Sequence, residues 1–392
     1  MRILHSIDSV NTIGGGPIEA LTQISIVSQK YGHTIEIVSL DDPDSSWVKG
    51  CRFKCHAMGP SMGKYGYTPR LVPWLSKQRQ QYDAVIVHGL WQYSSFAVWC
   101  ALHGTNTPYY VFAHGMLDPW FKRTYPLKHL KKWLYWPWGE YRVLRDANAV
   151  LFTCESERKL ARQSFWFYRC NELVVNFGTA APPNEPVEQR NAFLAEFPGL
   201  HDKRCLLFLG RLHVKKGPDL VIRAFAKILD TLDAGRTENL HLIMAGPDED
   251  PYAQSLHRLA GQLGLKERIT WTGMLKGRLK WGAFRVADAF VLPSHQENFG
   301  IAVAEALACG VPVLISNQVN IWYEIQRADA GYVASDDESG CELLLWRWLE
   351  SDGETWAQMS RNASQLFAEK FDVEINAQSL ISTMKDSALQ SS

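Results

Sequence analysis

The sequence predicts an α/β protein built from two doubly wound units. Short apolar runs of strand length alternate with helical patterns along nearly the whole chain, which is typical of parallel sheets with crossover helices. At 392 residues the chain exceeds what one ordinary hydrophobic core supports. A segment with three prolines, residues 180–186, interrupts the alternation near the middle. These observations place a domain boundary near 178–186.

Strand-like runs mark the order of each predicted domain. In the N-terminal domain, residues 1–178, they lie at 2–7, 34–39, 84–88, 109–113, 148–152 and 172–175. In the C-terminal domain, residues 179–371, they lie at 204–209, 240–245, 268–272, 288–292, 311–315 and 331–333. A helical tail from about 354 to 388 follows without a further strand.

Composition predicts a globular cytoplasmic protein. Hydrophobic residues make up 46% of the chain and charged residues 21%. Residues 1–180 hold 20 Lys and Arg against 13 Asp and Glu, so the first half is the basic one. The eight cysteines show no paired metal spacing and are expected to be reduced thiols. Residues 1–7 are expected to form a strand rather than a signal peptide, and the apolar run 85–102 is too interrupted to span a membrane.

The stretch from His295 to Val313 predicts a strand, loop and helix with an open N-terminus. Gly300 precedes an alanine-rich helical segment that Gly310 ends. The backbone N–H groups from Asn298 to Ile301, Phe299 and Gly300 included, lack helical acceptors, so a phosphate group is expected there. The carboxylates of Glu297 and Glu305 suit the hydroxyls of a sugar or ribose.

A glycine loop follows the first predicted strand. Gly14, Gly15 and Gly16 permit close backbone approach, and Gly15 and Gly16 are expected to lie beside a ligand because ligands bind at strand carboxyl ends in open sheets. The alternative is a tight turn without a ligand.

Histidines follow two other predicted strands. His114 comes after the run 109–113, and His88 ends the run 84–88 as a second candidate. On the crevice side of the sheet His114 would donate to a sugar hydroxyl, and on the other side it would cap a loop.

Two cations follow the first strand of the C-terminal domain. Arg211 and Lys216 lie on one predicted loop, where an arginine fork and a mobile lysine could both reach a diphosphate. The alternative is a solvated charge cluster. The acids 248–250 superficially resemble a metal motif, but a helix N-terminus is the favoured interpretation.

An aromatic and basic stretch spans residues 120–145. Eight Trp, Tyr and Phe side chains alternate with seven Lys and Arg, and Glu140 is the only acid. This composition suits an anionic membrane surface. The alternative is that the aromatics pack inside the domain, because Pro126 and Pro137 break any long amphipathic helix. No motif supports nucleic-acid binding.

The 297–305 stretch, the segment 208–217 and the N-terminal glycine loop together resemble family 4 retaining glycosyltransferases of GT-B fold. The resemblance implies two Rossmann-like domains facing a cleft, with a last helix at about 372–392 crossing back to the first domain. It implies that Arg211 and Lys216 stabilise the leaving diphosphate, and that His114 contacts the donor sugar. It also implies that Glu297 orients that sugar, that Glu305 holds the ribose, and that backbone groups near Met274 and Leu275 face the base.

The prediction is therefore a retaining, metal-independent transferase that moves a hexose from a nucleotide diphosphate sugar to a glycan or lipid-linked acceptor. No further cofactor is expected. The turn at 271–277 has no carboxylate for guanine, which favours UDP over GDP. The protein could also lie at the inner face of the membrane. A nucleotide-sugar epimerase and a catalytically silent nucleotide-sugar-binding protein are the alternatives.

Overall fold

The computed structural model describes residues 1–11 and 16–390, without the side chains of 123, 234 and 387–390. The chain divides into two compact units. Unit 1 comprises Met1–Gly178 together with Val373–Ser392, and unit 2 comprises Thr179–Asp372. Each unit contains one parallel sheet with flanking helices.

Unit 1 contains a seven-stranded parallel sheet of order β3-β2-β1-β4-β5-β6-β7. Its strands are β1 (Arg2–Ile7), β2 (Thr34–Ser39), β3 (Lys54–Ala57), β4 (Ala84–His88), β5 (Tyr109–Phe112), β6 (Ala149–Phe152) and β7 (Glu172–Val174). Strands β2 and β3 are added on one side of β1, and the next strand, β4, is added on its other side. The order of the strands therefore reverses between β1 and β4. That reversal opens a crevice at the carboxyl ends of these two strands.

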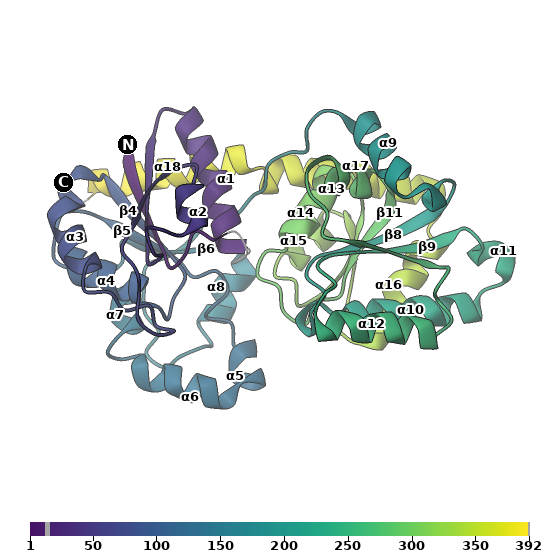
Figure 1. Cartoon of the computed structure of the whole chain (residues 1–392), viewed down its shortest axis with the longest axis horizontal. Coiled ribbons are helices and arrows are strands. Elements are labelled where there is room, and N and C mark those ends of the chain that lie inside the picture. Colours follow the sequence, from purple (N-terminus) through teal and green to yellow (C-terminus); the bar gives the residue numbers. More distant parts are fainter. Residues whose placement is uncertain (12–15, 391–392) are drawn as a thin grey trace. The chain divides into compact units, whose positions relative to one another are not determined.

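The helices of unit 1 are short except for the first and the last (Figure 1). They are α1 (Gly16–Lys30), α2 (Ser46–Lys49), α3 (Leu71–Gln78), α4 (Tyr93–Leu102), α5 (Trp120–Thr124), α6 (Pro126–Tyr135), α7 (Glu140–Arg145), α8 (Glu155–Ala161) and α18 (Val373–Gln390). Helix α18 packs on α1, and Lys30 forms an ion pair with Glu374 at that contact.

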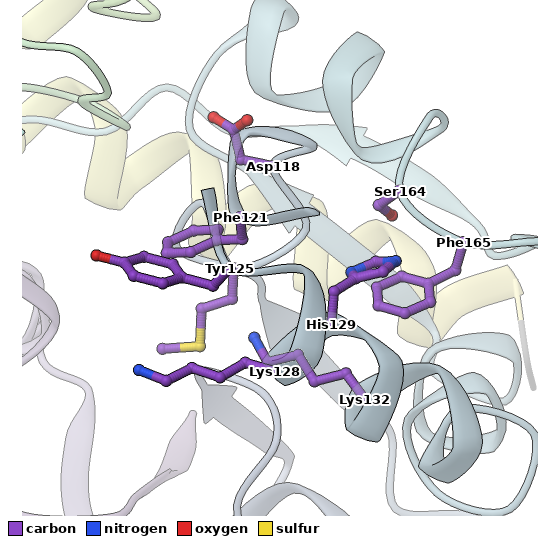
Figure 2. Close-up of a pocket in the computed structure, with 9 residues that line it drawn as sticks. Asp118, Phe121, Tyr125, Lys128, His129, Lys132, Ser164 and Phe165 are labelled. Carbon is purple, nitrogen blue, oxygen red and sulfur yellow. The ribbon is translucent and has the colours of Figure 1, made fainter. Parts of the chain in front are cut away.

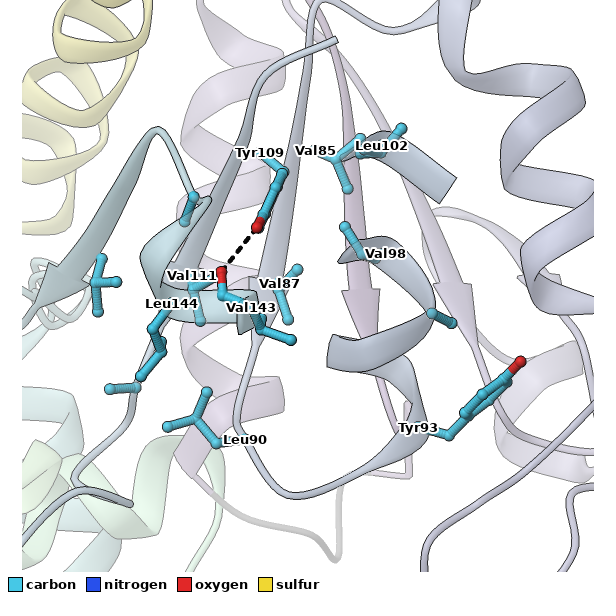
Figure 3. Packing of buried hydrophobic residues seen from close by; sticks show 14 of the residues in the cluster. Val85, Val87, Leu90, Tyr93, Val98, Leu102, Tyr109, Val111, Val143 and Leu144 are labelled. Atoms are coloured by element: carbon cyan, nitrogen blue, oxygen red, sulfur yellow. Dashed lines mark hydrogen bonds between the residues drawn. The ribbon is translucent and has the colours of Figure 1, made fainter. Parts of the chain in front are cut away.

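A core of aliphatic side chains holds α4 and α7 on the unit 1 sheet (Figure 3). Val85, Val87 and Val111 project from β4 and β5 and are fully buried. The hydroxyl of Tyr109 donates to the carbonyl of Val143 over 2.7 Å, so the polar tip of this buried ring is satisfied. This packing fixes the carboxyl ends of β4 and β5, where His88 and His114 lie.

Unit 2 contains a six-stranded parallel sheet of order β10-β9-β8-β11-β12-β13. Its strands are β8 (Arg204–Leu209), β9 (Leu240–Ala245), β10 (Ile269–Gly273), β11 (Ala287–Leu292), β12 (Val313–Ser316) and β13 (Gly331–Ala334). The direction of travel reverses between β8 and β11, which makes the carboxyl ends of these strands the expected ligand crevice.

Helices cover both faces of the unit 2 sheet, with α10, α12 and α16 on one face and α13, α14 and α17 on the other (Figure 1). The helices are α9 (Pro186–Glu196), α10 (Pro218–Thr231), α11 (Ala234–Thr237), α12 (Pro251–Gln262), α13 (Gly277–Val286), α14 (Ile301–Ala308), α15 (Trp322–Arg327), α16 (Glu338–Glu350) and α17 (Gly353–Leu366). Short turns of other helix types lie at Arg79–Gln81 in unit 1 and at Pro198–Leu200, Val214–Lys216 and Phe367–Phe371 in unit 2.

The doubly wound α/β architecture predicted from the sequence is confirmed in both units. The prediction missed β3, a four-residue edge strand in which no side chain is fully buried. An edge strand with little buried surface carries a weak hydrophobic pattern, which explains the omission. Among the helices of the described chain, none has the length and hydropathy of a membrane span.

Candidate functional site

The loop after β8 carries both predicted diphosphate ligands. Arg211 is exposed, while Lys216 ends a short 3-10 turn and is half-buried. Gly217 follows with φ of +65°, and a Cβ there would lie 2.6 Å from the carbonyl oxygen of Pro293. Only glycine fits this combination of positive φ and close backbone approach. The β8 loop is thereby pressed against the loop that follows β11.

A backbone hydrogen bond joins the same two loops. The N–H of His295 donates to the carbonyl of Lys215 over 2.9 Å. The ring of His295 lies 2.8 Å from a carboxylate oxygen of Asp336, which ties the β11 loop to the segment after β13. The loop after β8, with its two predicted cations, and the loop after β11, with Glu297, are therefore held together. Both lie at the carboxyl ends of neighbouring strands.

Lys216 and Glu297 form an ion pair that joins these two loops. Their side chains retain 18% and 16% of their exposure, so the pair is largely desolvated. Burial and the neighbouring cations Lys215 and Arg211 lower the pKa of Lys216. The backbone of Glu297 is also fixed, because its N–H donates to Gln318 and its carbonyl accepts from Asn320, each over 3.0 Å.

Helix α14 begins where the sequence predicts it. Gly300 has φ of +77° and precedes Ile301 without a side-chain cap. The first N–H groups of such a helix have no intrahelical acceptors, and the helix dipole favours an anion there. The side chain of Phe299 is buried against Phe371, at 5.5 Å between ring centroids. Phe299 can therefore offer a ligand only its backbone.

Glu305 lies on the second turn of α14 and is 7% exposed. The ammonium group of Lys280, on α13, donates to its Oε1 over 2.6 Å. The sequence analysis did not identify Lys280, since nothing in the spacing of α13 and α14 along the chain predicts that these two side chains meet. Lys280 thus pairs with Glu305, the carboxylate predicted to bind ribose, as Lys216 pairs with Glu297.

The turn after β10 carries Met274 and Leu275, the predicted base contacts. Met274 is exposed and Leu275 half-buried. The N–H of Gly246 donates to the carbonyl of Gly273, and that of Gly210 to Ala245, each over 2.9 Å. These bonds align the ends of β8, β9 and β10, so the turn lies on the same sheet edge as Arg211.

Of the acids 248–250 that follow β9, Asp250 acts at a helix terminus, the interpretation favoured from the sequence. A carboxylate oxygen of Asp250 accepts from the N–H of Ala253 over 2.8 Å and caps α12. This carboxylate is therefore already used within the fold.

Three histidines of unit 1 form a row that runs from inside β1, through the end of β4, to the loop after β5. Nδ1 of His5 lies 2.8 Å from Nε2 of His88, and Nδ1 of His88 lies 3.1 Å from Nε2 of His114. Burial lowers the pKa of His5 to about 3 and that of His114 to about 4, and it holds the pKa of His88 well below the usual value. A neutral imidazole carries one N–H, so the central ring, His88, donates to one neighbour and accepts from the other. Both hydrogen bonds therefore run in the same direction along the row.

The loop that carries His114 is strained and firmly anchored. His114 has φ of +48°, an unusual value for a residue with a side chain. The N–H of Gly115 donates to the buried carboxylate of Glu157 over 2.6 Å, and both the N–H and the hydroxyl of Thr153 donate to its other oxygen. The sequence analysis did not identify Glu157. Its position five residues after the predicted strand 148–152 was the one available signal.

An open cavity of about 600 Å³ lies beside the start of α1. It is lined by polar groups of Asp8, Ser9 and Gln92 and by apolar side chains that include Met116. Gly16 is the first residue of α1, and no atom lies within 4 Å of a Cβ built there. Gly15, the other predicted glycine contact, falls outside the described residues.

The stretch 120–145 fits both interpretations in part: some of its aromatic side chains pack inside unit 1, and others are exposed. Pro126 begins α6 and Pro137 lies outside the helices, so the stretch forms three short helices rather than one. Trp136 is buried, whereas Leu127, Trp133 and Trp138 are exposed. Glu140 is buried and accepts from the N–H of Trp91 over 2.6 Å and from the hydroxyl of Ser95 over 2.9 Å. Part of the stretch is core, and α6 presents apolar surface to solvent.

Two family models match the two units. The model for glycosyl transferases group 1 matches residues 191–366, and that for the glycosyl transferase 4-like domain matches residues 23–176. Unit 2 therefore belongs to the glycosyl transferases group 1 family, and unit 1 to the glycosyl transferase 4-like domain family. The group 1 match of this glycosyltransferase includes Arg211, Lys216, Glu297 and Glu305, and the 4-like match covers most of unit 1.

Relatives of this glycosyltransferase include enzymes that act on an inositol phosphate. It is 25% identical over 229 residues to the D-inositol 3-phosphate glycosyltransferase of Streptomyces avermitilis, covering 58% of this chain and 49% of that protein. It is 32% identical over 178 residues to the enzyme of the same name from Mycolicibacterium smegmatis, covering 45% and 39%. The match spans at most about half the length of these relatives.

Solved structures share the fold of this glycosyltransferase over its full length. Anabaena HepE in complex with UDP and glucose gives a TM-score of 0.76 at 17% identity, covering 98% of this chain and 99% of that one. Sucrose-phosphate synthase from Thermosynechococcus elongatus gives 0.77 at 18% identity, covering 98% of each chain. The GT-B fold implied by the sequence resemblance is therefore confirmed. The roles of the individual site residues stay predictions.

Proposed function

We propose that this protein is a retaining glycosyltransferase that moves a hexose from a nucleotide diphosphate sugar to a hydroxyl of a glycan or lipid-linked acceptor. The observation that carries the proposal is the Lys216–Glu297 pair beside the N-terminus of α14. A phosphate-binding cation, a hydroxyl-binding carboxylate and a helix N-terminus lie at one strand edge. Together they fit the two halves of a sugar diphosphate.

In the proposed reaction the bond between the sugar C1 and the β-phosphate oxygen breaks. The acceptor oxygen bonds to C1 on the same face, and its proton moves to an oxygen of the departing diphosphate. Arg211, Lys216 and the α14 N-terminus stabilise the charge that develops on the diphosphate. Because these groups already supply positive charge, we propose that no divalent metal or other cofactor takes part.

Glu297 is proposed to orient the transferred hexose and Glu305 to bind the ribose hydroxyls. Backbone groups near Met274 and Leu275 are proposed to face the base. UDP is favoured over GDP because the turn lacks a carboxylate for guanine, and the HepE complexes with UDP and UDP-glucose support that choice. The inositol phosphate relatives support a hydroxyl acceptor.

A thermal-shift panel tests donor binding. UDP, GDP, ADP and their sugars are added separately, because a ligand that binds only the folded protein raises its Tm. We expect UDP and its sugars to raise Tm in the wild type and not in an Arg211→Met, Lys216→Met double variant. No shift with any nucleotide would overturn the proposal.

The product distinguishes transfer from the alternatives. NMR of the glycoside formed from a UDP-hexose and an acceptor is expected to show the anomeric configuration of the donor. An inverted product would contradict retention. Conversion of the UDP-hexose to an isomer without any acceptor would instead identify an epimerase.

A further inference from the structure

Helix α6 covers a small cavity in unit 1 that the donor site does not use (Figure 2). Its volume is about 200 Å³, room for several water molecules at about 30 Å³ each. The walls are mostly apolar or aromatic, and the polar groups on them include Lys128, His129 and Lys132. Pockets that enclose a whole drug-sized ligand are larger, from about 300 Å³ upward. The cavity therefore suits one group of a larger molecule.

Lys132 lines this cavity and has no acid within ion-pair distance among the described residues. Among the described residues, neither Lys132 nor Lys128 forms an ion pair with an acid. The charge of Lys132 lies instead over the rings of Trp91 and Phe121, at 4.6 and 5.4 Å. Burial lowers the pKa of Lys132 to about 8; the buried carboxylate of Glu140 opposes this shift and the charge of Lys128 adds to it. A partly desolvated cation of this kind gains most from an added anion.

Lys128 supplies the second charge. It lies four residues before Lys132 on α6 and therefore on the same helix face. Its ammonium group lies 4.8 Å from the centre of the Tyr125 ring. Asp118 is the one acid of the lining, and its Oδ1 accepts from the N–H of Trp120 over 2.8 Å. In Figure 2 its carboxylate points away from the two lysine side chains.

A second face of α6 is apolar and exposed. Leu127, Leu130 and Leu134 retain 79%, 55% and 62% of their exposure, and their spacing places them on one side of the helix. Trp166 and Phe167 are two further exposed aromatic side chains, 73% and 84% exposed. Their loop is attached to the end of α6, because Nε1 of Trp136 donates to the carbonyl of Trp166 over 3.0 Å.

The charge of this region selects an anionic partner. Residues 119–139 contain five Lys and Arg and no acid. An apolar helix face with flanking cations is the composition of a helix that lies in the interface of an anionic bilayer. The two lysines in the cavity, on another side of the same helix, add a binding place for one phosphate group.

We propose that the α6 cavity binds the phosphate group of a lipid-linked acceptor, while the apolar face of α6 meets the hydrocarbon of the bilayer that holds it. The binding site stands on its own geometry. The role of its ligand as acceptor rests on the proposed glycosyltransferase function.

Calorimetric titration with dodecyl phosphate, dodecanol and inorganic phosphate tests the cavity. We expect dodecyl phosphate to bind at least about 10-fold more tightly than either of the others, because it alone satisfies both the lysines and the apolar surface. Lys128→Gln with Lys132→Gln should weaken its binding about 10-fold or more. Lys131→Gln, an exposed charge on the same helix outside the cavity lining, is the matched control.

The outcomes separate the sources of phosphate. Equal affinity for inorganic phosphate would identify a free-phosphate site and overturn the proposal, as would equal affinity for dodecanol or an equal effect of Lys131→Gln. Titration of UDP into the same double variant is expected to be unchanged. If UDP fails to bind even the wild type, the donor proposal fails, and the dodecyl phosphate result still decides the cavity.

Vesicle sedimentation tests the apolar face. Phosphatidylcholine vesicles that carry a polyprenyl phosphate are expected to sediment the wild type, and vesicles of phosphatidylcholine alone are not. Leu127→Gln with Leu134→Gln should reduce the bound fraction several-fold, whereas Leu343→Gln, an exposed leucine of unit 2, should not. Equal binding to both vesicles, or by both variants, would overturn the membrane half of the proposal.

Discussion

The ammonium group of Lys280 lies 2.6 Å from Oε1 of Glu305. Glu305 is the more buried partner, on α14, and Lys280 projects toward it from α13. Lys216 and Glu297 repeat the arrangement on the neighbouring loops. Both carboxylates proposed to bind donor hydroxyls are therefore held by a lysine before any ligand arrives, which fixes their orientation.

Lys280→Met is expected to lower the free energy of unfolding by about 1–3 kcal/mol, because it leaves a buried carboxylate without its cation. Urea denaturation of the wild type and of Lys280→Met measures the difference in the free energy of unfolding. Lys276→Met, at an exposed position just before α13, is the control and should change stability little. An unchanged midpoint for Lys280→Met would show that the pair does not stabilise unit 2.

Gly217→Ala should destabilise unit 2 by about 1–3 kcal/mol and weaken nucleotide binding. The added Cβ would meet the carbonyl of Pro293 at 2.6 Å, and the positive φ is strained for alanine. Gly261→Ala, in the last turn of α12 with open space around it, should be neutral or stabilising by up to about 1 kcal/mol. Wild-type UDP affinity in Gly217→Ala would contradict the close coupling of the two loops.

His88→Phe tests the histidine row. Phenylalanine retains the ring stacking but removes both hydrogen bonds, so His114 loses the contact that fixes its ring. We expect the transfer rate to fall about 10-fold with UDP affinity unchanged. His103→Phe, a partly exposed histidine of the same unit, is the control. Unchanged transfer by His88→Phe would show that the row does not position His114.

Glu140 makes the stability of unit 1 depend on pH. Burial raises the pKa of Glu140 from 4.5 to about 7, so the folded state binds this proton more tightly than the unfolded state. The stability it contributes is complete below about pH 4.5 and is lost as pH rises through about 7, by about 3 kcal/mol. Glu140→Gln should flatten the Tm difference between about pH 5 and about pH 8. Glu19→Gln, on the surface of α1, should leave it unchanged.

The sequence predicts the elements well because buried parallel strands are apolar runs. Val85–Val87 and Leu206–Phe208 are continuous hydrophobic segments, and both became central strands. Lys54–Ala57 failed to signal a strand because it lies at an edge with no fully buried side chain. The hydrophobic sequence pattern that predicts a strand reflects how much of the strand is buried, so this pattern is weak where the strand is only partly buried.

The candidate site was predictable where its chemistry is local. Gly300 and Glu297 belong to one loop, and Arg211 and Lys216 to another, so position after a strand was sufficient to single them out. Lys280 and Glu157 were missed because each acts through a partner from a different element. Contacts of that kind depend on how helices pack on the sheet, which sequence spacing does not record.

The most direct test of the donor site compares Glu297→Ala with Glu305→Ala. Calorimetric titration with UDP is followed by a transfer assay with UDP-hexose. Glu297→Ala should retain UDP affinity and lose transfer, because its carboxylate is proposed to orient the sugar. Glu305→Ala should lose UDP affinity about 10-fold or more, because its carboxylate is proposed to bind ribose. Equal loss of UDP affinity in both variants, or loss in neither, would contradict the proposed division between the two carboxylates.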